Sequence, residues 1–357
     1  MTPIRFSPRA LGHACAAVLL TGAPLSMAAP QHLTLLTWED YLSPEVIERW
    51  HARTGVAIEQ IYFDTGDKRD EILARPDHDI DLVLTERVSS ERFGARGVLD
   101  PISEKNLPNL DHIGASWRER CGPYSVSYLW GTLGIAYRAD RIAVAPDSWA
   151  DLLRPTLATP HVIMIADHED ILAAPLIYLG HSINTTDNDA LKAAFEMLRA
   201  QAPAVLSYEY AITSLKAQRY LEHADMALAF SGDQHALNEV EGVEGTPWQY
   251  VVPKEGTLLW TDCFSVPSRT PNKELAYRFL AFLGEPDIAA LNAEALGVAT
   301  PNDAALPLLP ASVREDRSIY PPASVLQRSQ VYEARPLEST QTRRRIISAL
   351  INAHDTR

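Results

Sequence analysis

Short apolar runs alternate along the chain with amphipathic segments, which predicts alternating strands and helices. In the first part of the chain we predict helices over 44–54, 67–74 and 89–94, and strands over 33–37, 56–63, 80–84 and 132–137. Ser43-Pro44 marks the start of the first of these helices, and Gly55 marks its end.

The second part of the chain repeats this alternation and then turns mainly helical. Helices are predicted over 149–153, 170–179, 187–200 and from 272 onward, and strands over 162–165, 227–230 and 249–252. No repeat of 20–50 residues is visible. Strand–helix units in two blocks, in a chain of 357 residues, predict an α/β protein with two lobes.

The first 28 residues have the pattern of a secretory signal peptide. Arg5 and Arg9 precede an apolar run from Ala14 to Leu20, and Ser26-Met27-Ala28 supplies small residues at a cleavage site. The apolar run is too short to span a bilayer. Cys15 lies at the front of this run, which argues against a lipid-anchored form. We therefore predict a signal peptide over 1–28 and a periplasmic mature chain.

The chain carries a net charge of −14 at pH 7, which favours cationic ligands and disfavours nucleic acid as a partner. Cys121 and Cys263 remain after the predicted cleavage, with no CxxC motif and no zinc-like spacing. An oxidising compartment would permit a disulfide between them, but their separation in space is left open by the sequence. No motif indicates a cofactor.

Four short segments combine aromatic and acidic residues, and at least three lie just beyond a predicted strand. They are Trp38-Glu39-Asp40-Tyr41, Asp167-His168-Glu169-Asp170, Phe230-Ser231-Gly232-Asp233 and Trp260-Thr261-Asp262. Ligands of open α/β sheets bind at the carboxyl ends of the strands. Aromatic faces cover methylene groups and attract cations, while carboxylates form charge-assisted bonds to N–H groups. This pattern predicts a site for an alkyl chain that bears ammonium groups.

Each segment also has a purely structural interpretation. An aspartate that follows a strand is often a helix N-cap, which is a sufficient role for Asp167 and Asp233. Tryptophan and phenylalanine at strand ends are usually core residues. The recurrence of four such segments favours the ligand-binding interpretation.

Several further stretches, in order and spacing, make the chain resemble the periplasmic spermidine/putrescine-binding proteins over nearly its whole mature length. They include residues 37–41, 80–83, 128–132, 148–152, 252–256, 260–262 and 300–302. The resemblance implies the two-lobed periplasmic binding protein fold of type II, with a hinge between the lobes. It divides the chain into 29–137 plus 261–306 for one lobe and 138–260 plus 307–357 for the other.

The resemblance also implies which positions contact the ligand. Ten are predicted from the matching and departing positions, namely Trp38, Glu39, Tyr41, Glu86, Asp167, Asp170, Phe230, Asp233, Trp260 and Asp262. Glu39 stands where the family has serine or threonine, and Glu86 stands near a family serine. Val88 and Val298 replace tyrosines. The tail after Arg328 aligns poorly, so Tyr332 is only a further candidate.

Three functions remain open. The first is a monomeric capture protein that delivers a polyamine to the membrane permease of an ABC transporter. The second is a polyamine sensor that regulates a membrane receptor of the cyclic-di-GMP class. Cys121-Gly122 and residues 124–128 and 131–135 resemble that branch. The third is an exported hydrolase with a carboxylate pair such as Asp167 and Asp170. The absence of a nucleophile elbow, an HExxH motif or a Ser/His/Asp signature favours a protein that is not an enzyme.

Overall fold

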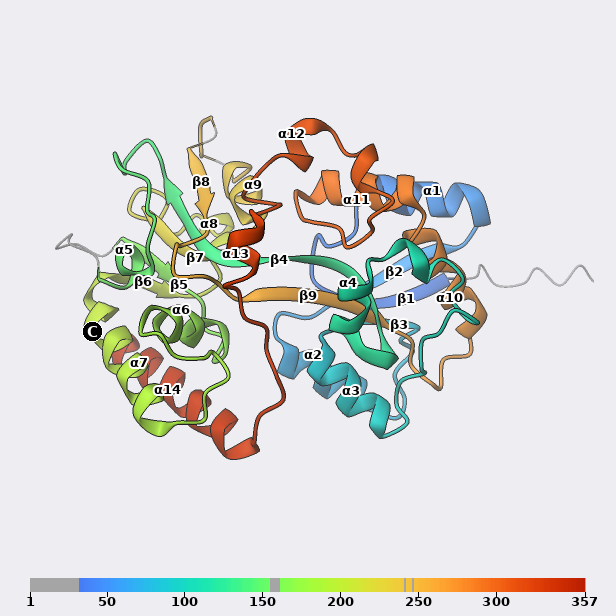
Figure 1. Cartoon of the computed structure of the whole chain (residues 1–357), viewed down its shortest axis with the longest axis horizontal. Coiled ribbons are helices and arrows are strands. Elements are labelled where there is room, and N and C mark those ends of the chain that lie inside the picture. The colour runs from blue at the N-terminus through green and yellow to red at the C-terminus, as the bar shows by residue number, and fades with distance from the viewer. Residues whose placement is uncertain (1–31, 155–160, 241, 246, 357) are drawn as a thin grey trace, which may run out of the picture.

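The computed structural model describes residues 32–154, 161–240, 242–245 and 247–356, so the predicted signal peptide lies outside the described residues. The strands pair in the order β2-β1-β3-β9-β4-β7-β5-β6, with β8 added to β4. Figure 1 shows two lobes side by side, with β4 and β9 running from one toward the other. No helix in the described part of the chain is long and apolar enough to cross a membrane.

The first lobe is built on the sheet half that contains β1, β2 and β3. Its strands are β1 (His32–Thr37), β2 (Ala57–Tyr62), β3 (Leu82–Thr85), β9 (Leu259–Ser265) and the first part of β4 (Val126–Arg138). Its helices are α1 (Pro44–Thr54), α2 (Gly66–Leu73), α3 (Arg87–Ala95), α4 (Ala115–Cys121), α10 (Lys273–Leu283) and α11 (Pro286–Leu296). β1 is parallel to β2 and β3, whereas β9 is antiparallel to both β3 and β4.

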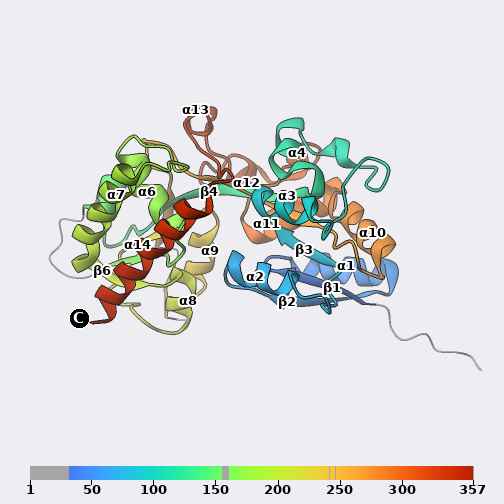
Figure 2. The ribbon, with the colours of Figure 1, turned by 90° about the horizontal axis from the view of Figure 1, so that it is seen from below.

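The second lobe is built on the sheet half that contains β5, β6 and β7. Its strands are the last part of β4, β5 (Val162–Met164), β6 (Val205–Tyr208), β7 (Met226–Phe230) and β8 (Trp248–Val251). Its helices are α5 (Trp149–Leu153), α6 (Asp170–Tyr178), α7 (Asn188–Gln201), α8 (Ala211–Lys216), α9 (Asp233–Asn238) and α14 (Leu337–Asp355). Figure 2 shows α14 lying along this lobe. α12 (Ala311–Arg314) and α13 (Ala323–Leu326) lie in the segment that leads from α11 to α14.

β4 belongs to both lobes. Its residues 126–132 pair with β9, and its residues 133–137 pair with β7. The predicted strand over 132–137 covers only the second part. Ser127 and Gly131 interrupt the apolar pattern of the first part, whose strand structure depends on pairing with distant β9. The division of the chain at 137 and 306 stays a prediction.

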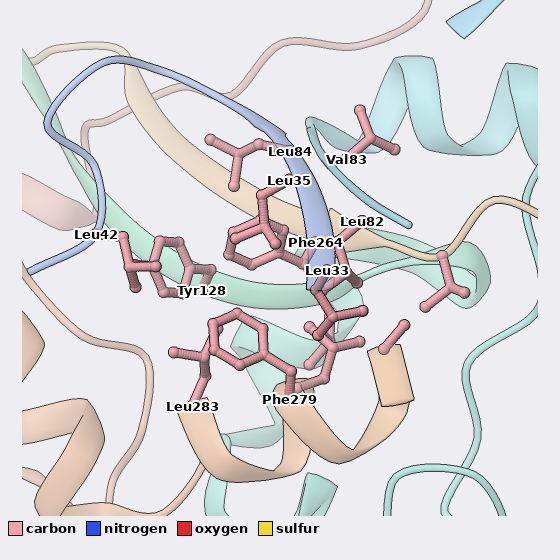
Figure 3. Packing of buried hydrophobic residues seen from close by; sticks show 14 of the residues in the cluster. Leu33, Leu35, Leu42, Leu82, Val83, Leu84, Tyr128, Phe264, Phe279 and Leu283 are labelled. Carbon is pink, nitrogen blue, oxygen red and sulfur yellow. The ribbon is translucent and has the colours of Figure 1, made fainter. Parts of the chain in front are cut away.

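Each lobe has its own hydrophobic core. In the first lobe β1, β3 and β9 contribute Leu33, Leu35, Leu84 and Phe264, and α10 contributes Phe279 (Figure 3). The core of the second lobe gathers side chains from β4, β5, β7, α5, α6 and α7, and α14 adds Ile347 and Leu350. The tail of the chain is therefore anchored in the second lobe.

The predicted helix boundaries follow local capping chemistry. α1 begins at Pro44 and ends before Gly55, which has a φ of 72°. The Ser43 side chain makes no capping bond, and the Ser43 backbone N–H instead donates to Asn292 Oδ1 at 3.0 Å. α5 has a complete capping box, formed by Ser148 and Asp151.

Cys121 and Cys263 form a disulfide, with 5.9 Å between their Cα atoms. The sequence left this pairing open. The bond ties the last residue of α4 to β9, one residue after Asp262.

Candidate ligand-binding site

Three of the four segments singled out from the sequence lie at the carboxyl ends of strands. Trp38 follows β1, Asp167 follows β5, and Phe230 ends β7. β1 is parallel to β3, and β5 is parallel to β7, so the carboxyl ends of each pair share one edge of the sheet. Trp260 and Asp262 lie within β9, two residues apart on one face of the strand.

Tyr41 and Asp262 form the first of three tyrosine–aspartate pairs. The Tyr41 hydroxyl donates to Asp262 Oδ2 at 2.7 Å. The Tyr41 carbonyl in turn accepts from the Tyr128 hydroxyl at 2.8 Å, and Tyr128 is held by Asn292 at 2.8 Å. Burial raises the pKa of Asp262 to about 7, although the hydrogen bond from Tyr41 opposes the shift.

Tyr210 and Asp233 form the second pair. The Tyr210 hydroxyl donates to Asp233 Oδ1, and the backbone N–H of Phe230 donates to Asp233 Oδ2 at 2.7 Å. Burial raises the pKa of Asp233 to about 7 despite these two bonds. Asp233 is also the first residue of α9, whose N-cap position is Gly232, so its carboxylate binds the backbone of Phe230 and does not cap the helix.

Tyr332 and Asp170 form the third pair, with the Tyr332 hydroxyl 2.8 Å from Asp170 Oδ1. Burial raises the pKa of Asp170 well above its usual range, and the charges of Asp167, Glu169 and Asp262 add to this effect. Because Asp262 belongs to the other lobe, the acids of the two lobes are close enough to influence each other. Likewise, Tyr210 contributes to the raised pKa of Tyr41 across the lobes.

Aromatic side chains accompany these pairs. The rings of Phe230 and Trp260 meet edge to face, with 6.3 Å between their centroids. Trp260 Nε1 donates to the Thr132 carbonyl at 3.3 Å. A Cβ atom on Gly131 would lie 2.4 Å from Cζ2 of Trp260, so the indole can occupy this position because residue 131 of β4 has no side chain. Trp38 is half-buried and contacts Phe63, with 4.2 Å between the ring centroids.

The remaining candidates have other partners. Oδ1 of Asp167 accepts from the backbone N–H groups of Glu169 and Asp170 at 2.7 and 3.1 Å, which caps the start of α6. Glu39 is exposed. Burial alone would raise the pKa of Glu86, but the guanidinium of Arg69 outweighs it and lowers the pKa to about 2.

The structure thus brings together Tyr41, Asp170, Phe230, Asp233, Trp260 and Asp262. This arrangement offers one buried and two half-buried carboxyl groups beside aromatic rings from both lobes. The family described as bacterial extracellular solute-binding protein matches residues 45–319. The chain belongs to this family.

Individual proteins match over most of the chain. A norspermidine sensor of Vibrio cholerae is 33% identical, over 92% of this chain and 91% of that protein. A spermidine/putrescine-binding periplasmic protein of Salmonella typhimurium is 28% identical, over 84% of this chain and 85% of that protein. A putrescine-binding periplasmic protein of Escherichia coli is 30% identical, over 84% and 86%.

Solved structures confirm the predicted fold. A spermidine/putrescine ABC transporter substrate-binding protein from Streptococcus pneumoniae superposes with a TM-score of 0.78 at 25% identity, over 91% of this chain and 99% of that chain. A putative spermidine/putrescine ABC transporter from Listeria monocytogenes gives a TM-score of 0.79 at 26% identity, over 90% and 99%. The family, the Salmonella typhimurium and Escherichia coli relatives and the Streptococcus pneumoniae structure are described as binding proteins.

Tyr210 was missed from the sequence, although a signal was present. Glu209-Tyr210 is an acidic and aromatic pair directly beyond β6, in the same relation to its strand as the other segments. The short strand β6 was not recognised, and the tyrosine therefore had no predicted place. Tyr332 was only a further candidate, because its segment lies in the tail.

Proposed function

We propose that this solute-binding protein is exported to the periplasm, where it captures a linear polyamine between its two lobes and delivers it to an ABC transporter. The observation that carries the proposal is the set of three tyrosine–aspartate pairs beside Trp260 and Phe230. The names of the relatives support the same ligand class.

The chemistry of these groups suits an aliphatic amine. An ionised carboxylate balances the charge of an ammonium group, and a tyrosine hydroxyl holds the carboxylate in position. Aromatic rings cover the methylene groups between the amines and attract the cations to their faces. Trp260 and Asp262, on one face of β9, would act together on one end of the ligand.

The raised pKa values of the aspartates describe the protein without ligand. When an ammonium group arrives, it stabilises the ionised carboxylate and lowers the pKa of that group. Binding at neutral pH would therefore release protons. No step of this cycle breaks or forms a covalent bond, and we propose that the chain is not an enzyme. Its monomeric state stays a prediction.

Calorimetric titration of ligand-stripped protein tests the ligand class. Putrescine, cadaverine, spermidine, norspermidine and spermine form the test series, with glutamate and a neutral sugar as controls. We expect at least one polyamine to bind and the controls to give no heat. Tight binding of a control with no binding of any polyamine would overturn the proposal.

A polyamine sensor is a second candidate, since the norspermidine sensor of Vibrio cholerae is 33% identical over 92% of the chain. Its partner would be a membrane receptor rather than a permease. Deletion of the gene separates the two functions. Loss of radiolabelled polyamine uptake indicates transport, whereas intact uptake with a changed cyclic-di-GMP level indicates sensing.

A further inference from the structure

Two glutamates lie beside the paired aspartates, and both are paired with arginine side chains. Glu169 precedes Asp170 in the chain and raises the pKa of Asp170. In the first lobe, Glu86 raises the pKa of Asp262. Each glutamate is therefore close enough to add its charge to that of the neighbouring aspartate.

Two arginines from the tail hold Glu169. Arg335 and Arg343 both pair with Glu169 Oε2, the second at 3.4 Å. Their side chains are 8% and 0% exposed, so solvent screens these charges weakly. Arg343 also donates to the carbonyls of Ile183 and Thr185 at 2.7 and 3.0 Å, which fixes its position.

Arg335 links this charge pair to the third tyrosine–aspartate pair. Nη1 of Arg335 donates to Asn184 Oδ1 at 2.6 Å, and its guanidinium lies 5.4 Å from the centre of the Tyr332 ring. Tyr332 donates to Asp170. One short segment of the tail thus supplies both the hydroxyl that holds Asp170 and the cation that neutralises its neighbour Glu169.

The first lobe repeats this arrangement with different elements. Nη1 of Arg69 on α2 lies 2.5 Å from Glu86 Oε2, and the Arg69 side chain is 4% exposed. Its Nη2 donates to Ser89 Oγ at 2.8 Å, and its guanidinium lies 5.8 Å from the ring centre of Phe63. Phe63 in turn contacts Trp38.

We propose that three arginines, Arg69, Arg335 and Arg343, are specificity-determining residues. They determine which polyamine charge the site selects by pairing with the glutamates beside it. Two arginines pair with Glu169, and Arg69 pairs with both Glu86 and Asp70, so that the tyrosine-linked aspartates are left to face the amine groups. The number of ammonium groups that bind favourably is then limited by these arginines. The inference rests on the proposed polyamine function. It adds how the binding site distinguishes polyamines that carry different numbers of ammonium groups.

The experiment compares the dissociation constants of putrescine, spermidine and spermine in the parent and in four variants. In Arg335→Gln, the charge of Glu169 is less compensated, because Arg343 is then the one arginine that still pairs with it, beside His168 at 3.5 Å. We expect the affinity for spermine relative to putrescine to rise about fivefold. The double variant Glu169→Gln/Arg335→Gln removes both charges and should return the ratio to the parent value.

Arg345→Gln is the matched control, because Arg345 lies on α14, which follows Arg335, is exposed and donates to Thr342 within that helix. Its charge change equals that of Arg335→Gln, and we expect it to leave the ratio unchanged. Glu169→Gln alone leaves two buried cations near Asp170 and should lower the ratio about fivefold. This variant decides the question if Arg335→Gln fails to fold.

An unchanged ratio in the folded variants, with the parent still binding polyamines, would overturn this inference and leave the proposed function intact. Absence of polyamine binding in the parent would instead overturn the proposed function. An equal loss of affinity for all three amines would assign these arginines a structural role only. A ratio that follows the charge at position 169 supports the inference.

Discussion

The hydroxyl of Tyr41 lies 2.7 Å from Oδ2 of Asp262, although 221 residues separate the two in the chain. Tyr41 follows β1, whereas Asp262 lies within β9, and β3 stands between these strands in the sheet. The hydrogen bond therefore depends on the complete assembly of the first lobe. It holds the carboxylate that we expect to grip one amine.

Asp262→Asn should lower polyamine affinity about 30-fold or more, because breaking a buried charge pair costs about 2–5 kcal/mol. The asparagine side-chain oxygen can still accept from Tyr41, so we expect the melting temperature without ligand to stay near that of the parent. Calorimetry and thermal unfolding measure the two effects. Asp111→Asn changes an exposed aspartate and serves as the control; unchanged affinity in Asp262→Asn would remove Asp262 from the site.

Polyamine affinity should increase with pH. Burial raises the pKa of Asp262 and Asp233 to about 7 without ligand, while a bound ammonium requires both to be ionised. The amines stay protonated over this range, so we expect affinity to rise about tenfold or more between pH 6 and pH 8. Titration at several pH values tests this, and a flat profile would contradict it. Asp262→Asn should flatten the profile in part.

The stability of the ligand-free protein should change with pH in the opposite direction. Asp262 and Asp233 have folded-state pKa values raised to about 7, above an unfolded value of about 3.9. The folded state therefore binds more protons than the unfolded state between these values, and these groups make the free energy of unfolding fall as pH rises through this window. A saturating polyamine should then raise the melting temperature more at pH 8 than at pH 5.5, which thermal unfolding can measure.

Trp260→Ala should lower polyamine affinity several-fold, because the ring that covers the methylene chain and faces the cation is lost. Trp149 offers a contrasting site, since its side chain is fully buried in the second lobe. Trp149→Ala should lower stability by about 3–5 kcal/mol through loss of core packing. If Trp260→Ala instead lowers stability sharply and leaves affinity intact, Trp260 belongs to the core alone.

Gly131→Ala should weaken polyamine binding, because it displaces the indole of Trp260. An added Cβ would lie 2.2 Å from Ser231 Oγ and 2.4 Å from Trp260 Cζ2, so the indole must move away from its position. We expect several-fold weaker binding, and a polyamine should induce a smaller change in tryptophan fluorescence. Gly66→Ala is the control, because its added Cβ would make an ordinary 3.6 Å contact with Arg69. Equal fluorescence responses in both variants would contradict the role of Gly131.

Local sequence chemistry predicted the elements that depend on neighbouring residues. The proline and glycine at the ends of α1 act within a few residues and were found where expected, and a capping box starts α5 over the predicted residues 149–153. The position of the acidic residues beyond β5 and β7 was also predictable, because each group follows a short apolar run. The family resemblance named Asp170 and Asp233 as ligand-contacting residues, and that contact stays a prediction.

Partnerships between distant segments could not be predicted in the same way. Glu86 was named as a ligand-binding residue, and whether it contacts a ligand stays untested, but its carboxylate is bound to Arg69 from the preceding helix. Nothing in the pattern of charges distinguishes Arg343, which is buried, from Arg344 and Arg345, which are exposed. Which arginine faces inward is decided by how α14 packs on the second lobe.

The disulfide between Cys121 and Cys263 closes a covalent ring across a sequence separation of 142 residues. Every strand of the second lobe, from β4 to β8, lies inside this ring. In the chain-entropy description, closing so large a ring lowers the entropy of the unfolded chain by an amount equivalent to about 5 kcal/mol at 25 °C. A single proteolytic cut inside the ring also leaves the two fragments covalently linked by the disulfide, so one cut in the second lobe does not separate it from the first.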